Sequence, residues 1–170
     1  TEPLKQDVEI VGHIALYIYA SITSDDADFI VTLKDVPPSG PGLPPSGPEF
    51  VLTRGWLKAS HRELDNEKSK PWKPYHTHTN PQPVVPGEVN EYAIELQPIA
   101  NLFKKDHKIQ LEIWPCDYPA EPYYDWTQMW GLVAPHVPYG KEVTYGIYYT
   151  PKYPSYILLP IITTPGEKWP

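Results

Sequence analysis

The sequence predicts an all-β fold, a two-sheet sandwich or jelly roll whose strands are joined by long proline-rich loops. Twenty-three prolines among 170 residues remove backbone donors and fix φ, so helices are disfavoured along most of the chain. Thirteen tyrosines and six tryptophans favour a pleated, half-buried surface. Apolar residues also alternate with a period of two in several segments, which is typical of strands with one buried face.

Two alternating segments near the N-terminus predict the first two strands. Between residues 13 and 22, the apolar residues of one face are Ile14, Leu16, Ile18, Ala20 and Ile22. Between residues 29 and 34, one face carries Phe29, Val31 and Leu33, and the other carries Ile30, Thr32 and Lys34. Successive side chains of a strand point to opposite faces, so each segment predicts a strand with one face in the core.

Further strands are predicted along the rest of the chain. In "GWLKASHREL", Leu57 and Ala59 lie opposite a face with Trp56, Lys58, Ser60 and Arg62. Other inward sets are Tyr92, Ile94 and Leu96; Ile109, Leu111 and Ile113; and Val143, Tyr145, Ile147 and Tyr149. "SYILLPII" predicts a final strand, and a helical turn or two is expected near Gln97–Lys104, where "PIANLF" breaks the alternation. The total is seven or eight strands, which describes a sandwich.

Three long connections separate these strands. Residues 36–48, "VPPSGPGLPPSGP", contain a near-duplicate PPSGP and predict an exposed loop biased to polyproline II. Residues 65–87 and 115–140 are also long. Loops of that length are usually functional or cover a sheet edge.

Composition excludes several classes of protein. A net charge of −7 without a basic cluster argues against a nucleic-acid partner. The longest apolar stretch, around residues 156–162, is too short for a membrane helix, so we expect no membrane span. Cys116 is the only cysteine, which allows no internal disulfide and favours a reducing, cytoplasmic compartment. The chain begins at Thr1 and its first residues resemble no signal peptide, so we expect a fragment of a longer protein.

Ser60 and His61 are the one adjacent pair that suggests a nucleophile with its base. On the strand predicted here their side chains point to opposite faces, so the imidazole cannot reach the hydroxyl. The sequence also contains no G-x-S-x-G elbow, since Ser39 and Ser46 precede glycines within proline-rich loop sequence. We therefore expect no catalytic residue in this chain.

Metal sites are not expected either, and no cofactor is implied. Asp25, Asp26 and Asp28 lack the spacing, central glycine and final glutamate of a calcium loop, and are expected to cap a turn. His76 and His78 have the i, i+2 spacing of two ligands on one strand face, but a third ligand is not identifiable. Outward carboxylates at Glu91, Glu95 and Glu112 are explained by a solvated face.

Aromatic residues in or near the long loops are the strongest candidates for a binding surface, because exposed aromatic surface often marks an interaction site. They are Trp56, Trp72, Tyr75, Tyr123, Tyr124, Trp126 and Trp130. Trp56 is preferred, since it lies on the less apolar face of its strand, and Trp72 and Tyr75 are its expected companions at a domain interface or pocket rim. The alternative is that these rings seal loops onto the sandwich.

Several motifs, in order, resemble the C-terminal domain of the X-prolyl dipeptidyl-peptidase, cocaine esterase and α-amino-acid ester hydrolase family. "DDADFIVTLKDV" is similar to its "D-x-D-F…L-x-D-V", and "RGWLKASHREL" to its "G-x-L-r-a-s-h-R". "PGEVNEYAIELQPIANLFKKDHKIQLEI" and "YPSYILLPII" resemble its later segments. The resemblance covers nearly the whole chain. Asp106 departs from it, because the family usually has glycine before the histidine at position 107.

The resemblance implies a galactose-binding-like jelly roll without catalytic residues. In that family the Ser, Asp and His of the triad lie in a preceding α/β-hydrolase domain, on which the jelly roll packs and whose pocket it helps to wall. The parent protein would be a serine hydrolase acting on acyl esters or X-prolyl peptides, with a homo-oligomer left open. The alternative function is an independent carbohydrate- or ligand-binding jelly roll that uses its loop aromatics.

Overall fold

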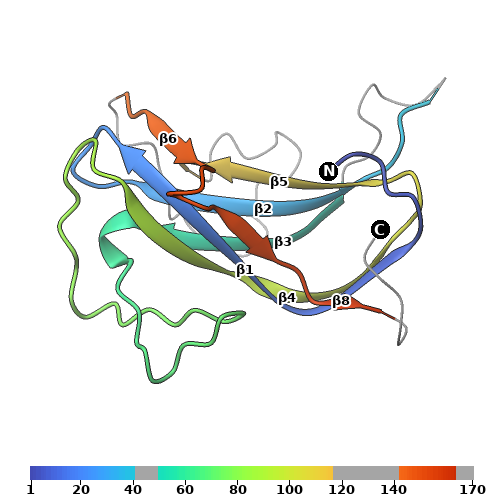
Figure 1. Cartoon of the computed structure of the whole chain (residues 1–170), viewed down its shortest axis with the longest axis horizontal. Coiled ribbons are helices and arrows are strands. Elements are labelled where there is room, and N and C mark those ends of the chain that lie inside the picture. Colours follow the sequence, from blue (N-terminus) through green and yellow to red (C-terminus); the bar gives the residue numbers. More distant parts are fainter. Residues whose placement is uncertain (41–49, 117–141, 164–170) are drawn as a thin grey trace, which may run out of the picture.

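The computed structural model describes residues 1–40, 50–116 and 142–163, which form two antiparallel sheets packed face to face (Figure 1). The five-stranded sheet, here sheet A, contains β1 (Val8–Ile22), β4 (Asn90–Phe103), β6 (Tyr145–Tyr148), β7 (Tyr156–Leu158) and β8 (Ile161–Ile162). The three-stranded sheet, here sheet B, contains β2 (Asp28–Val36), β3 (Phe50–Lys58) and β5 (Lys108–Trp114). The predicted all-β sandwich is confirmed.

Long strand β1 is the centre of sheet A. Strand β4 pairs with it along nearly its whole length on one side, and β6, β7 and β8 pair with successive parts of its other side. The segment "SYILLPII" thus forms two short strands rather than the single one predicted, and Pro160, which has no N–H to donate, lies between them. In the described ranges no helix is both long and apolar enough to span a bilayer.

The helical turn predicted near Gln97–Lys104 is wrong, because β4 continues as a strand to Phe103. The alternation breaks there for another reason. Ile14 pairs with Leu96, whereas Gly12 pairs with Ile99, so β4 has one residue more than β1 at this point. Such a β-bulge shifts the phase of the inward face of β4. On the opposite strand Gly12 has φ of +133°, which glycine adopts readily.

Sheet B has β2 at its centre, with β3 and β5 at its edges. The predicted alternation of β2 is present, but its two faces are both buried. Phe29 points into the sandwich, where its ring lies 4.7 Å from the ring of Tyr92 in β4 and 5.4 Å from that of Tyr145 in β6. The core therefore joins the two sheets through β2, although the set predicted at residues 143–149 contributes only Val143 and Tyr145 to it.

The two sheets approach each other closely where β3 packs against β4. A Cβ atom on Gly55 would lie 2.2 Å from the carbonyl oxygen of Glu95, a distance that no side chain can adopt. Two residues earlier, the hydroxyl of Thr53 donates to the carbonyl of Gln97 at 2.6 Å. Glycine at position 55 is therefore required for this edge of the sandwich to close.

We predict that Gly55→Ala lowers the free energy of unfolding by about 1–3 kcal/mol or more, because backbone must move to admit the methyl group. Gly87→Ala is the matched control, because no atom lies within 4 Å of the position of its Cβ. That variant should lose only the roughly 1 kcal/mol cost of its positive φ. Urea unfolding measures both changes, and equal losses would contradict the close approach of the sheets.

Candidate functional site

Ser60 and His61 lie in a 3₁₀ turn, Ala59–His61, and not on the strand predicted for them. Strand β3 ends at Lys58. The N–H of Ala59 still donates to the carbonyl of Ala27 at 2.8 Å, in register with the Asp28–Lys58 pair, but the N–H of Ser60 donates to the side chain of Asp26. The face predicted to join Trp56, Lys58, Ser60 and Arg62 therefore ends at Lys58. Because Ser60 and His61 do not lie on a strand, the contacts of each side chain decide whether the two residues can act together.

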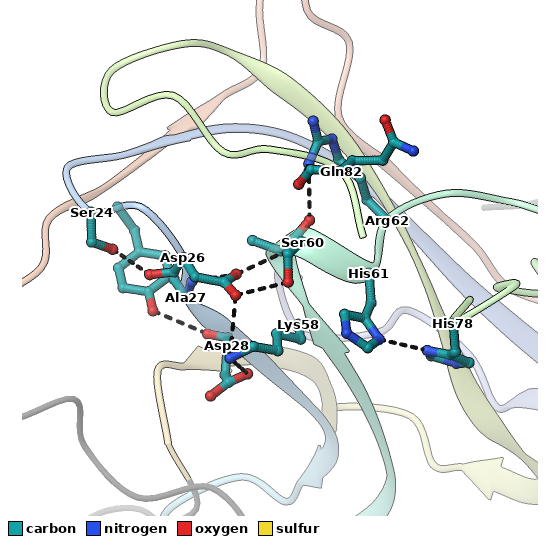
Figure 2. Close-up of polar contacts among 12 residues, drawn as sticks. Ser24, Asp26, Ala27, Asp28, Lys58, Ser60, His61, Arg62, His78 and Gln82 are labelled. Atoms are coloured by element: carbon teal, nitrogen blue, oxygen red, sulfur yellow. Dashed lines mark hydrogen bonds and ion pairs between the residues drawn. The ribbon is translucent and has the colours of Figure 1, made fainter. Parts of the chain in front are cut away.

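The hydroxyl of Ser60 donates to Oδ2 of Asp26 at 2.7 Å (Figure 2). Oδ1 of the same carboxylate accepts from the N–H groups of Ser60 and Ala27, each at 3.0 Å. Nζ of Lys58 lies 3.4 Å from Oδ2. Asp26 thus links the turn before β2 to the turn after β3, and we call this set the Asp26 clamp. Its geometry gives Ser60 a structural role, since its hydroxyl is directed at a carboxylate and not at an imidazole.

His61 faces another histidine, with its Nδ1 3.0 Å from Nδ1 of His78 (Figure 2). Burial lowers the pKa of His78, and the neighbouring His76 and His61 lower it further. His76 itself uses Nε2 to contact the carbonyl oxygen of Ala93 at 2.8 Å. One of the two Nδ1 atoms donates to the other in this contact, and the i, i+2 pair considered from the sequence is divided between two different contacts.

Within the described residues, no group of three or more His, Cys, Asp or Glu side chains is arranged to hold a metal ion. Of the three aspartates considered for calcium, Asp26 already accepts three hydrogen bonds, and Asp28 lies 3.9 Å from Nζ of Lys58. These contacts agree with the turn-capping role expected for this segment.

Arg62 and Glu63 hold the long loop that follows the turn. The guanidinium of Arg62 donates to the carbonyls of Ala59, Gln82 and Pro83. The carboxylate of Glu63 accepts from Thr77, Asn80 and Gln82 at 2.7–3.1 Å. Both ends of the loop are therefore fixed by charged groups whose hydrogen bonds are charge-assisted.

Trp56 is 43% exposed, as expected from its position on the outward face of β3. The register of sheet B pairs Ile30 of β2 with Trp56 on one side and with Trp114 of β5 on the other. Paired residues of adjacent strands share a face, so both indoles lie on the outer face of sheet B beside Ile30. Trp114 is 46% exposed. We call Trp56, Ile30 and Trp114 the tryptophan row.

A carboxylate fixes Trp114 in this row. The indole Nε1 donates to Oε2 of Glu112 at 3.1 Å, while Lys34 and Gln110 contact Oε1 at 2.9 and 2.7 Å. Burial raises the pKa of Glu112, but the hydrogen bonds from Lys34, Trp114 and Gln110 outweigh it and hold the pKa below its usual value. Glu112, expected from the sequence to be a solvated charge, therefore has a positioning role.

Trp72 and Tyr75 are exposed too, at 53% and 45%, but they belong to another side of the molecule. Tyr17, on the outer face of sheet A, donates to the carbonyl of Pro71 at 2.9 Å and so holds the segment next to Trp72. The ring of Tyr75 lies beneath Nζ of Lys68 within the same loop. The segments that carry these two rings thus contact sheet A and their own loop, whereas Trp114 shares the outer face of sheet B with Trp56.

Sequence reasoning did not select Trp114, although the pattern that placed Ile113 inward also places Trp114 outward. Tyr123, Tyr124, Trp126 and Trp130, four of the candidate aromatics, lie outside the described residues. Asp106 has φ of +68°, so it adopts the left-handed conformation that the glycine of the resembling motif would favour. That departure leaves the turn before β5 in place.

Comparison with known proteins agrees with the motifs and the fold. Residues 1–158 match the family model described as the X-Pro dipeptidyl-peptidase C-terminal non-catalytic domain. The chain belongs to this family. It is 28% identical to a cocaine esterase from Rhodococcus over 164 residues, which cover 95% of this chain and 25% of the esterase. A putative serine esterase from Mycobacterium tuberculosis is 33% identical over 116 residues, 65% of this chain and 17% of that protein.

The fold is also found in a solved structure, a CocE/NonD family hydrolase from Staphylococcus aureus. That structure is 26% identical, with a TM-score of 0.76 over 95% of this chain and 29% of the hydrolase. The chain thus spans about a quarter or less of the length of the curated relatives that it matches. The resemblance deduced from the motifs is confirmed at the level of the family and of its non-catalytic domain.

We predict that Asp26→Asn lowers the free energy of unfolding by about 1.5–3 kcal/mol, because three hydrogen bonds lose their charge assistance and the ion pair with Lys58 is removed. Asp106→Asn makes the same chemical change at an exposed position and should stay within about 0.5 kcal/mol of the native chain. Chemical unfolding of both variants measures the difference. Equal stability of the two variants would show that the Asp26 clamp does not stabilise the fold.

Proposed function

We propose that this chain is the C-terminal part of a longer serine hydrolase that cleaves acyl ester or X-prolyl peptide bonds. In this proposal the chain packs on a preceding α/β-hydrolase domain and shapes the substrate pocket of that domain. The observation that supports it most strongly is the family match over residues 1–158, since that domain is non-catalytic. The matched region is only 25–29% of the Rhodococcus esterase and the staphylococcal hydrolase, so their activities involve much more chain than is present here.

The tryptophan row is the surface that we propose for packing on the catalytic domain. Tryptophan is enriched among the residues that contribute most to protein interfaces, where its large ring fills a pocket of the partner. Two half-exposed indoles on one sheet face, one of them fixed by Glu112, form a rigid apolar surface of this kind. Rigid side chains lose little conformational entropy on binding, which favours docking.

An independent ligand-binding module is the second candidate, and a group of tyrosines on sheet A favours it. The rings of Tyr17 and Tyr156 stack 5.0 Å apart, and Tyr153 contacts both Tyr19 and Tyr148 at 5.5–5.6 Å. Carbohydrates bind to flat aromatic surfaces in the lectin-type jelly rolls that this fold class includes. This group lies on the sheet opposite to the tryptophan row, so the two functions can be tested separately.

We predict that the isolated chain does not hydrolyse p-nitrophenyl acetate or an X-Pro-p-nitroanilide. Ser60 is the serine that the sequence suggests as a nucleophile, but its hydroxyl donates to Asp26 and no imidazole activates it. Initial rates of the purified chain and of Ser60→Ala should both equal the buffer rate. Turnover that Ser60→Ala abolishes would make this chain an enzyme in its own right.

We predict that Trp114→Ala weakens packing on a catalytic domain. The chain can replace the equivalent C-terminal segment of the staphylococcal hydrolase, and esterase activity and melting temperature can be followed in this fusion. Trp114→Ala and Trp56→Ala should lower the melting temperature of the fusion by several degrees, while the isolated chain changes much less.

Tyr149→Ala is the control for the fusion, because Tyr149 is 85% exposed and lies outside the tryptophan row. It should leave the fusion unchanged. If the tryptophan variants behave like Tyr149→Ala, the tryptophan row is not the docking surface. If they instead abolish self-association of the isolated chain in size-exclusion chromatography, the surface serves a homo-oligomer.

A further inference from the structure

The outer edge of β5 has the properties of a strand that lacks one neighbour. Among residues 1–40, 50–116 and 142–163, sheet B has three strands, and β5 pairs with β2 on one side only (Figure 1). Exposed strand edges carry rows of backbone donors and acceptors that pair readily with another segment. The contacts of the first four residues of the chain show where such pairing has already begun.

Thr1 and Leu4 form antiparallel contacts with the beginning of β5 and the turn before it. The N-terminal ammonium of Thr1 donates to the carbonyl of Ile109 at 2.8 Å, and the N–H of Ile109 donates to the hydroxyl of Thr1 at 3.0 Å. Leu4 donates to the carbonyl of His107 and accepts from the N–H of Asp106. Residue numbers rise from Thr1 to Leu4 while those of their partners fall from Ile109 to Asp106. The two segments therefore run antiparallel.

The backbone groups of Leu111 and Ile113 continue this edge. In an antiparallel strand, alternate residues direct their N–H and C=O groups to opposite sides. Ile109 directs both groups to Thr1, so Leu111 and Ile113 direct theirs to the same open edge, while Gln110 and Glu112 face β2. Within the described residues, the structure records no backbone hydrogen bond for Leu111 or Ile113 at that edge.

The burial of the inward side chains of β5 decreases from Ile109 towards the end of the strand. Ile109, beside Thr1 and Leu4, is only 6% exposed. Leu111 and Ile113 point to the same inner face, yet they are only partly buried and pack against the margin of the core. The core is therefore closed where N-terminal residues cover it and is open where they do not.

We propose that β5 pairs with one more antiparallel strand, and that this strand consists of the residues that lead directly into Thr1 in the longer hydrolase. The inference rests on the proposed function, because it requires chain that precedes Thr1. The Thr1–Ile109 pair sets the register: the second residue before Thr1 lies opposite Leu111, and the fourth lies opposite Ile113. Paired residues share a face, so these two positions take apolar side chains that close the core.

The test adds six residues before Thr1 in three versions. The first has valine at the second, fourth and sixth positions before Thr1 and threonine between them. The second exchanges the valine and threonine positions, which keeps the composition but directs valine to the outer face. The third is a Gly/Ser sequence of the same length. When a residue is added before Thr1, the ammonium group of Thr1 becomes a peptide N–H, and this N–H can still donate to the carbonyl of Ile109.

Amide hydrogen exchange followed by NMR gives the readout at Leu111 and Ile113, with Gln110 and Glu112 as internal references. The first version should slow exchange at Leu111 and Ile113 at least tenfold relative to the Gly/Ser version, with the phase-exchanged version between them. The melting temperature should rise in the same order, because more apolar surface is buried. The reference amides, which already face β2, should change much less.

Two results would overturn the proposal. Equal exchange at Leu111 and Ile113 in all three versions would mean that β5 does not accept a strand. Protection in the chain without an extension that increases with protein concentration would mean that a second copy occupies the edge. None of the three versions contains a catalytic domain. A negative exchange result would therefore not contradict docking through the tryptophan row, and a negative fusion result would not contradict the added strand on β5.

Discussion

The carboxylate of Asp26 is the constraint on which the arrangement of sheet B depends. It binds the N–H and the hydroxyl of Ser60, so the turn before β2 and the turn after β3 are joined at one end of the sheet. This junction fixes the register that pairs Asp28 with Lys58 and Ile30 with Trp56. A slip of one residue would turn Trp56 into the core and Leu57 out of it. The surface proposed for docking therefore depends on a partly buried polar contact and not on the tryptophans alone.

How far the sequence predicts this fold depends on whether the period of two is interrupted. It is continuous in β2 and β5. The inward face of β5 was predicted correctly, and the alternation predicted for β2 is present although both of its faces are buried. In β4 the extra residue between Leu96 and Ile99 shifts the phase, and a shift in phase resembles a helical turn when only one strand is considered. After Lys58 the pattern continues although the strand has ended, because the N–H and the hydroxyl of Ser60 bind the carboxylate of Asp26. Both errors have their cause in a partner strand or turn that is distant in sequence.

The candidate site was predictable to the same extent. The outward position of Trp56 follows from its own strand, and its exposure was expected. Its neighbour Trp114 lies 58 positions later in the sequence numbering and becomes a neighbour only because β2 stands between β3 and β5. No local pattern contains the order of strands in a sheet. The same limit applies to Glu112, whose role follows from Lys34 across the strand pair, and to His61, which meets His78 through a loop.

The tryptophan row and the open edge of β5 meet at the same strand, which limits how a preceding domain could be joined. Trp114 is the last residue of β5, and the edge carried by Leu111 and Ile113 runs from it towards Thr1. A strand added there would run antiparallel to β5, so its first residues would lie near Trp114 and its last would lead into Thr1. The chain before that strand would then enter at the end of sheet B that carries the tryptophan row. The tyrosine group on sheet A faces the other way and would stay open to solvent, so packing on a catalytic domain and binding of a ligand by the tyrosines are compatible in one molecule.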